Sequence, residues 1–213
     1  MMSVVTLSNL QKDALKEICN IGAGNATTSL SQLMDKKIVM NVPKVKVIPF
    51  DEVMHMIGGP EQIVVGMYFK IHGEAPGTVY FILSVEEAEA VIYDVTGGLK
   101  IDLLNNSSEE RKLGLSALQE VGNIITGSYL SALSDFTNLL MKSSIPHLAI
   151  DMAGAILSIG LIELSERSDY AIVIDTQLEA TRQQNDISSQ FFFLPDIDTV
   201  PILFQSLGMD SHD

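Results

Sequence analysis

One polar pattern occurs twice in this chain, and this repeat most constrains how the chain can fold. The pattern places Asp or Ser, Glu and Asn at positions i, i+4 and i+7, followed after 22 residues by Pro. The two copies are Asp13, Glu17, Asn20 and Pro43, and Ser116, Glu120, Asn123 and Pro146. A single Glu-x-x-Asn is weak evidence of function, but the same pair at the same distance from a proline in both halves is stronger evidence.

The repeat extends beyond the polar pattern. A shift of 103 residues superposes further residues, among them Leu10 on Leu113 and Gly24 on Gly127. Later in the chain the shift becomes 111 residues, and Gly97 then superposes on Gly208. We therefore predict a single domain over residues 1–213, built of two repeats at about 8–98 and 107–208, with about eight extra residues near 179–186.

The predicted fold class is α+β with internal duplication. Two similar halves are expected to pack around a pseudo-twofold axis, with an antiparallel sheet joined across the halves and two long helices on one face. Capping boxes Ser8–Gln11 and Ser107–Glu110 open the long helices, which end near residues 35 and 140. Shorter helices are expected at 51–57, 84–96 and 199–207. Strands are expected at 37–42, 44–50, 63–71, 78–83, 147–152, 155–164, 170–178 and 190–194.

The long helices have an apolar stripe, in which we place Leu10 and Leu113, and a polar strip. Gly22 and Gly24 interrupt the first helix, and each weakens it by about 1 kcal/mol relative to alanine. This predicts a close crossing of another helix there. Residues at i, i+4 and i+7 share a helix face, so the Glu and Asn of each copy form a strip that should face solvent.

Two interpretations of the strips remain open: an ordinary solvated face, or a site that positions groups. Asn is a poor helix former, which argues against the first interpretation. Its carboxamide has donors and acceptors that can hold a water, and the carboxylate can bind a Lys or Arg of a partner. Such groups suit phosphoryl transfer, which needs mainly positioning and charge stabilisation.

Composition excludes several other classes of function. The net charge of −14 argues against nucleic acid and anionic membranes as partners. Cys19 is the only cysteine, which fits a reducing cytosol, and no activating His lies near it in sequence, so it should pack as a small apolar group. No signal peptide, P-loop or compact metal-ligand cluster is visible. We therefore expect a cytoplasmic protein without a metal or cofactor of its own.

The doubled motif resembles that of the CheC/CheX/FliY family of chemotaxis phosphatases, and specifically its CheC class. The segments 17–26 and 120–129 are similar to the two helix cores of that class. The resemblance implies hydrolysis of the phosphoaspartate on the response regulator CheY, with Mg²⁺ held by the regulator. It also implies that Asn20 and Asn123 orient the attacking water and that Glu17 and Glu120 contact a lysine of CheY.

The remaining motif residues have lesser expected roles. Asp13 and Ser116 support the motif, and Pro43 and Pro146 shape the adjoining strand. The resemblance further implies that the receptor deamidase CheD binds and enhances the activity, with Asp151 as a candidate contact. The alternative is a non-catalytic adaptor or switch-like module that binds CheD or phosphorylated CheY. We expect a monomer, because the duplication already supplies a twofold partner.

Overall fold

The first half of the chain folds as helix, strand, helix, two strands and helix. The structure is a computed structural model, which describes residues 7–105, 109–164, 170–180, 187–196 and 198–209. Ser8 begins the chain's first helix with both hydrogen bonds of the predicted capping box. The elements are α1 (Asn9–Met34), β1 (Ile38–Pro49), α2 (Phe50–Met56), β2 (Ile63–Gly73), β3 (Gly77–Ser84) and α3 (Val85–Val95).

The second half repeats this order, with its first strand divided in two. Ser107 of the predicted second capping box, and residues 181–186 of the predicted insertion, lie outside the described residues. The elements are α4 (Glu109–Thr137), β4 (Met141–Ser143), β5 (His147–Met152), α5 (Ala153–Leu164), β6 (Tyr170–Ala180), β7 (Ile187–Pro195) and α6 (Thr199–Ser206).

All strands of the described chain belong to one antiparallel sheet, in the order β1-β6-β7-β3-β2-β4, with β5 also paired to β2. The order is symmetric about its centre. When each strand is replaced by its equivalent in the other half, β1 by β4 and β5, β2 by β6, and β3 by β7, the same order is obtained from the opposite end. The halves meet where β3 pairs with β7, with Tyr80 opposite Phe192 and Phe81 opposite Phe191. The predicted duplicated fold with a joined antiparallel sheet is therefore confirmed.

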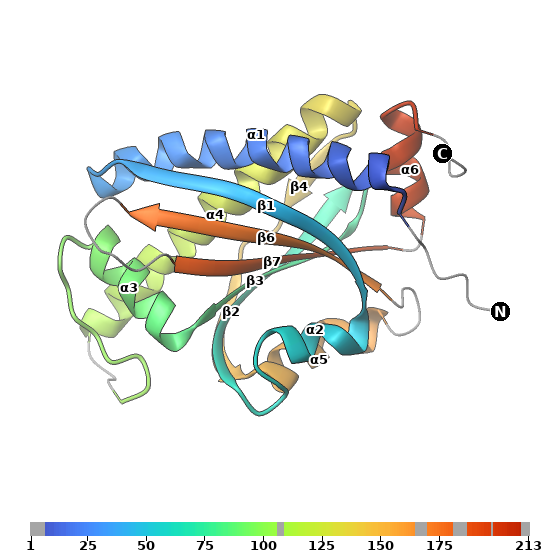
Figure 1. Ribbon diagram of the computed structural model, residues 1–213. Coiled ribbons are helices and arrows are strands. Elements are labelled where there is room, and N and C mark those ends of the chain that lie inside the picture. Colours follow the sequence, from blue (N-terminus) through green and yellow to red (C-terminus); the bar gives the residue numbers. More distant parts are fainter. Residues whose placement is uncertain (1–6, 106–108, 165–169, 181–186, 197, 210–213) are drawn as a thin grey trace.

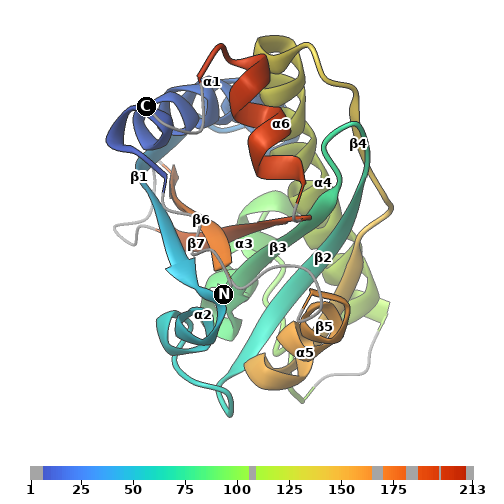
Figure 2. The ribbon, with the colours of Figure 1, turned by 90° about the vertical axis from the view of Figure 1, so that its right-hand side faces the viewer.

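Helices cover both faces of the sheet (Figures 1 and 2). The long helices α1 and α4 pack side by side on one face, as predicted, and α2 and α5 cover the opposite face. Strand β3 contributes side chains to the core on both faces of the sheet. Val79 and Phe81 face α1 and α4, whereas Tyr80 and Ile82 face α2 and α5. This alternation is the period of two expected for a strand buried on both sides.

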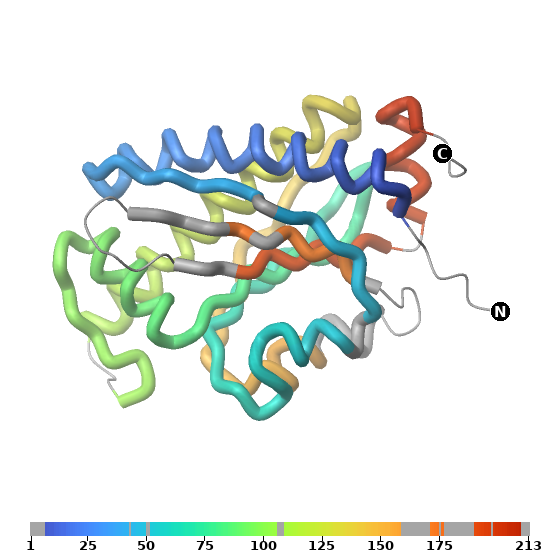
Figure 3. The backbone as a smooth tube through the Cα atoms, viewed as in Figure 1, coloured from blue at the N-terminus to red at the C-terminus, as the bar shows by residue number. Residues whose placement is uncertain are grey.

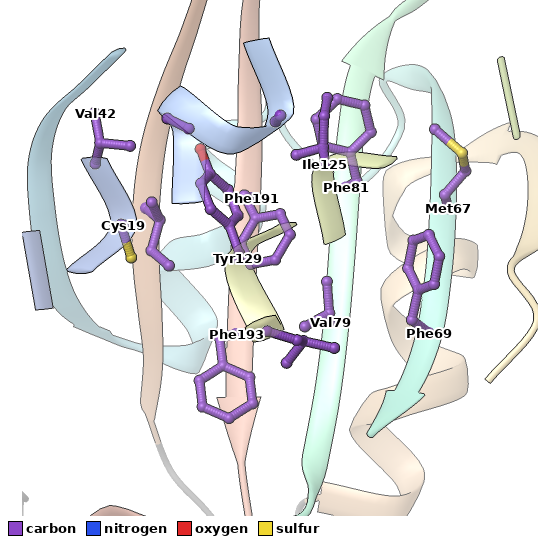
Figure 4. Close-up of a cluster of buried hydrophobic side chains, with 14 of the residues drawn as sticks. Cys19, Val42, Met67, Phe69, Val79, Phe81, Ile125, Tyr129, Phe191 and Phe193 are labelled. Carbon is purple, nitrogen blue, oxygen red and sulfur yellow. The ribbon is translucent and has the colours of Figure 1, made fainter. Parts of the chain in front are cut away.

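The larger core lies between the long helices and the sheet (Figure 4). Tyr129 of α4 packs edge-to-face on Phe191 of β7, with ring centroids 4.8 Å apart, and its hydroxyl lies 2.9 Å from Thr176 Oγ1. Cys19 is buried in the same layer, as predicted, and burial raises the pKa of its thiol to about 12. The thiol is therefore protonated at neutral pH and is not a nucleophile.

Two predictions about elements are wrong. Residues 155–164, expected as a strand, belong to the helix α5. Because this run is apolar throughout, its periodicity cannot distinguish a buried strand from a buried helix. Residues 37–42 and 44–50, expected as two strands, form the single strand β1, whose path along the edge of the sheet is visible in Figure 3. Its pairing with β6 shifts register between Asn41 and Lys44.

Three predictions about single residues are also wrong. Leu10 and Leu113, placed in the apolar stripe, are 58% and 59% exposed. A Cβ added at Gly24 would meet no atom within 4 Å, so no helix crosses there. Gly22 does mark the crossing, because a Cβ there would lie 3.0 Å from the Cα of Tyr129. No helix in the described part of the chain is both long and apolar enough to cross a membrane.

Candidate functional site

The second copy of the motif lies on an open face of α4. Ser116, Glu120 and Asn123 are all exposed, whereas Leu118 and Val121, on the opposite side of the helix, are buried in the core. The helix therefore presents the three polar side chains to solvent, as their spacing predicts. The Asn123 side chain makes no hydrogen bond to any residue that the structure describes.

The first copy lies on α1 and differs at its asparagine. Asp13 and Glu17 are exposed, but Asn20 is only half-buried, not fully exposed as predicted. The backbone N–H of Val42 donates to Asn20 Oδ1 at 2.9 Å. Asn20 Nδ2 in turn donates to the carbonyl oxygen of Val42 at 3.5 Å. The carboxamide of Asn20 is therefore attached to strand β1.

The irregular pairing of β1 explains this attachment. Val42 lies within the register shift between Asn41 and Lys44, where the regular pairing with β6 is interrupted. A backbone N–H without a strand partner needs another acceptor, and Asn20 supplies it. Pro43, which follows Val42, has no N–H to satisfy. In the first half, the fixed distance from Asn to Pro thus brings the Val42 N–H, directly before Pro43, to the carboxamide of Asn20.

In the second half the equivalent segment follows a different path. Ile145 corresponds to Val42 under the 103-residue shift, yet it lies between β4 and β5 and is 85% exposed. The preceding residue bonds to β2 instead: Ser144 N–H donates to the Lys70 carbonyl oxygen at 2.8 Å, and Lys70 N–H donates to Ser144 Oγ at 3.0 Å. Pro146, directly before β5, is buried. Asn123 consequently makes no bond to this segment, in contrast to Asn20.

Neither strip contains a base or nucleophile of its own beyond the carboxylate. His55, His72 and His147 are exposed and lie on other elements, and His212 is outside the described residues. Within the described ranges, no group of three or more His, Cys, Asp or Glu side chains is placed to hold a metal ion. The strip can therefore bind a cation through Glu120 and orient a water through Asn123.

Asp151 lies on β5 and not on either long helix. It is exposed, pairs in register with Val64, and accepts a hydrogen bond from the backbone N–H of Met152 at 2.7 Å. Met152 and its strand partner Ile63 are 47% and 41% exposed. Because side chains alternate along a strand, Met152 and Ile63 face the side of the sheet opposite to Asp151.

Sequence reasoning missed four residues that share the open faces with Glu and Asn. These are Leu10 and Gly24 on α1, and Leu113 and Gly127 on α4. The signal that identifies them was present in the sequence, because both pairs superpose under the same shift as the Glu and Asn pairs.

Comparison with known proteins finds one family along most of the chain. A model of the CheC-like family matches residues 10–47 and 113–142, which include both Glu and Asn pairs. Over 198 residues the chain is 38% identical to the CheY-P phosphatase CheC of Bacillus subtilis (strain 168), covering 93% of this chain and 94% of that protein. A putative CheY-P phosphatase CheC1 of Halobacterium salinarum is 25% identical over 208 residues, 97% of this chain and 100% of the relative.

A solved structure has the same fold. The crystal structure of Thermotoga maritima FliY aligns with a TM-score of 0.77 over 95% of this chain and 98% of that chain. Its sequence is 19% identical, so this likeness concerns the fold alone.

Proposed function

This chain belongs to the CheC-like family, and we propose on that basis that it is a phosphatase that hydrolyses the phosphoaspartate of the response regulator CheY. The observation that carries the proposal is the pair of open helix faces, each with Glu three residues before Asn. A 38% identical relative is named as a CheY-P phosphatase, and the match covers nearly the whole chain.

The proposed reaction is an in-line hydrolysis of an acyl phosphate. A water oxygen bonds to phosphorus as the bond from phosphorus to the aspartyl oxygen breaks, and the products are the free carboxylate and inorganic phosphate. The carboxamide of Asn123 holds the water in line, while Glu120 binds a lysine of CheY and fixes the docking register. Because an acyl phosphate has a good leaving group and a loose transition state, positioning is sufficient without a strong base. Mg²⁺ belongs to the regulator.

CheD is the proposed second partner. Asp151 is exposed on β5, and so does not belong to either helix that carries a strip. An exposed acidic side chain suits a partner with a basic patch.

The test is the decay of phosphorylated CheY with and without this protein, and with CheD added. We expect the wild-type protein to accelerate the decay and the double variant Asn20→Ala and Asn123→Ala to lose the acceleration while remaining folded by circular dichroism. Gln32→Ala is the matched control, because it removes an exposed amide from the same helix about 18 Å away from Asn20.

Two results would contradict the proposal. Undiminished acceleration by the double variant would reject Asn20 and Asn123 as the positioning groups. If the wild-type protein fails to accelerate the decay even with CheD present, while still binding CheD or phosphorylated CheY, the adaptor alternative is correct.

A further inference from the structure

At only a few exposed positions do α1 and α4 have the same residue type, and on each helix these positions lie in one line. Eight equivalent positions are exposed in both helices under the 103-residue shift, and three of them carry the same residue in each half. These three pairs are Leu10 and Leu113, Glu17 and Glu120, and Gly24 and Gly127. Each step along the line is seven residues, about 10 Å of helix with a rotation of about 20°.

Packing against the described residues gives no reason for the exposed glycines. A Cβ added at Gly24 or Gly127 would meet no atom within 4 Å. Glycine weakens a helix relative to alanine, so an exposed glycine in mid-helix needs another reason. Each lies four residues after the motif Asn, and therefore on the same face and one turn away.

Shared ancestry of the halves does not by itself explain these residues, because neighbouring positions have diverged. Gly22, which the helix crossing requires, corresponds to Ile125, and Cys19 corresponds to Gly122. The exposed positions Asp13 and Thr28 are likewise replaced, by Ser116 and Ser131. The second half thus has no glycine at the position equivalent to the crossing residue Gly22. It does have one, Gly127, at the exposed position equivalent to Gly24.

We propose that Leu10 with Gly24, and Leu113 with Gly127, extend each Glu–Asn strip into a docking ridge for the phosphorylated receiver domain. Leucine supplies an apolar contact on the side of Glu away from Asn. Glycine lets the partner's backbone lie against the helix beside the carboxamide, where a methyl group would hold it away. The ridge is about 21 Å long. This inference rests on the proposed phosphatase function.

The test measures the rate of phosphate release against the concentration of phosphorylated CheY. The variants are Gly24→Ala with Gly127→Ala, and Leu10→Ser with Leu113→Ser. For each we expect KM to rise by roughly fivefold or more, as for other contacts that matter in an interface. The glycine variant should melt at or above the wild-type temperature, because alanine favours the helix. Leu140→Ser is the matched control, since Leu140 is 60% exposed outside both strips.

Two different failures can be distinguished. If the wild-type protein accelerates the decay and both double variants keep its KM and kcat, the docking ridge is wrong and the phosphatase function stands. If the wild-type protein itself does not act on phosphorylated CheY, the proposed function fails first. A glycine variant with raised KM but a lowered melting temperature would also overturn the inference, because the glycines would then have a role in the fold.

Discussion

The two asparagines of the motif differ in their hydrogen bonds, although their sequence context is nearly the same. Asn20 bonds to both backbone groups of Val42, whereas Asn123 bonds to no described residue. To orient a water, Asn20 must first release β1, and each such hydrogen bond contributes about 0.5–1.5 kcal/mol to stability. Under the proposed function, only the strip on α4 can act without such a release.

This difference gives a prediction for the single variants. Asn123→Ala should remove most of the phosphatase activity and leave the free energy of unfolding nearly unchanged. Asn20→Ala should lower activity less but destabilise the fold by about 1–3 kcal/mol, because it leaves the Val42 N–H without its acceptor. Steady-state kinetics and urea unfolding of both variants measure the two effects. Equal losses of activity with equal stability would mean that the bonds to Val42 open freely.

Periodicity was sufficient to predict which side of each helix carries Glu and Asn, but it could not predict how Asn20 is bonded. That bond depends on where Val42, 22 residues later, comes to lie after the chain has turned back. The exposure of Leu10 was missed for a related reason. Leu10 lies only about 20° from Glu17 around the helix, and its hydrophobicity was given more weight than its direction.

Among the elements, α1 and α4 depend on one glycine for their close approach. A Cβ at Gly22 would lie 2.7 Å from Tyr129 Cδ1 and 3.1 Å from the Ser128 carbonyl oxygen. Two residues later, Gly24 faces open space. The same helix therefore contains one glycine required by packing and one that packing does not require.

We expect Gly22→Ala and Gly24→Ala to change stability in opposite directions. Overpacking at the crossing costs about 1–3 kcal/mol, more than the helix gains from alanine, so Gly22→Ala should be destabilising. Gly24→Ala should stabilise the fold by about 0.5–1 kcal/mol. Thermal and urea unfolding of the two variants, compared with wild type, measure the difference. A stabilised Gly22→Ala variant would show that the helices can separate without loss.

Most elements were predictable because their apolar periods and caps are local features. The helix α5 was not, since an apolar run of this length reads equally as a buried strand. The 103-residue shift contained the missing information: it superposes the first residue of α5, Ala153, on Phe50, which begins α2. Reading the repeat as a constraint on secondary structure, and not only on the site, would have predicted this helix.

At the scale of the whole molecule, neither half completes its own sheet. Strand β1 of the first half pairs with β6 of the second, and β5 of the second half pairs with β2 of the first. The central contact between β3 and β7 also joins the halves. The main core is built in the same way, since Tyr129 packs on Phe191 but also against Gly22 of α1.

We therefore expect residues 1–105 alone not to fold as a monomer. In that fragment β1 lacks its partner β6 and β3 lacks β7, so two strands expose unpaired backbone groups and the apolar face between them. The fragment should show no cooperative thermal transition as a monomer, and mixing it with residues 106–213 should restore the transition in a one-to-one complex. Circular dichroism melting and size-exclusion chromatography measure both. A monomeric fragment that melts cooperatively would mean that each half is a domain in its own right, joined to its twin only by docking.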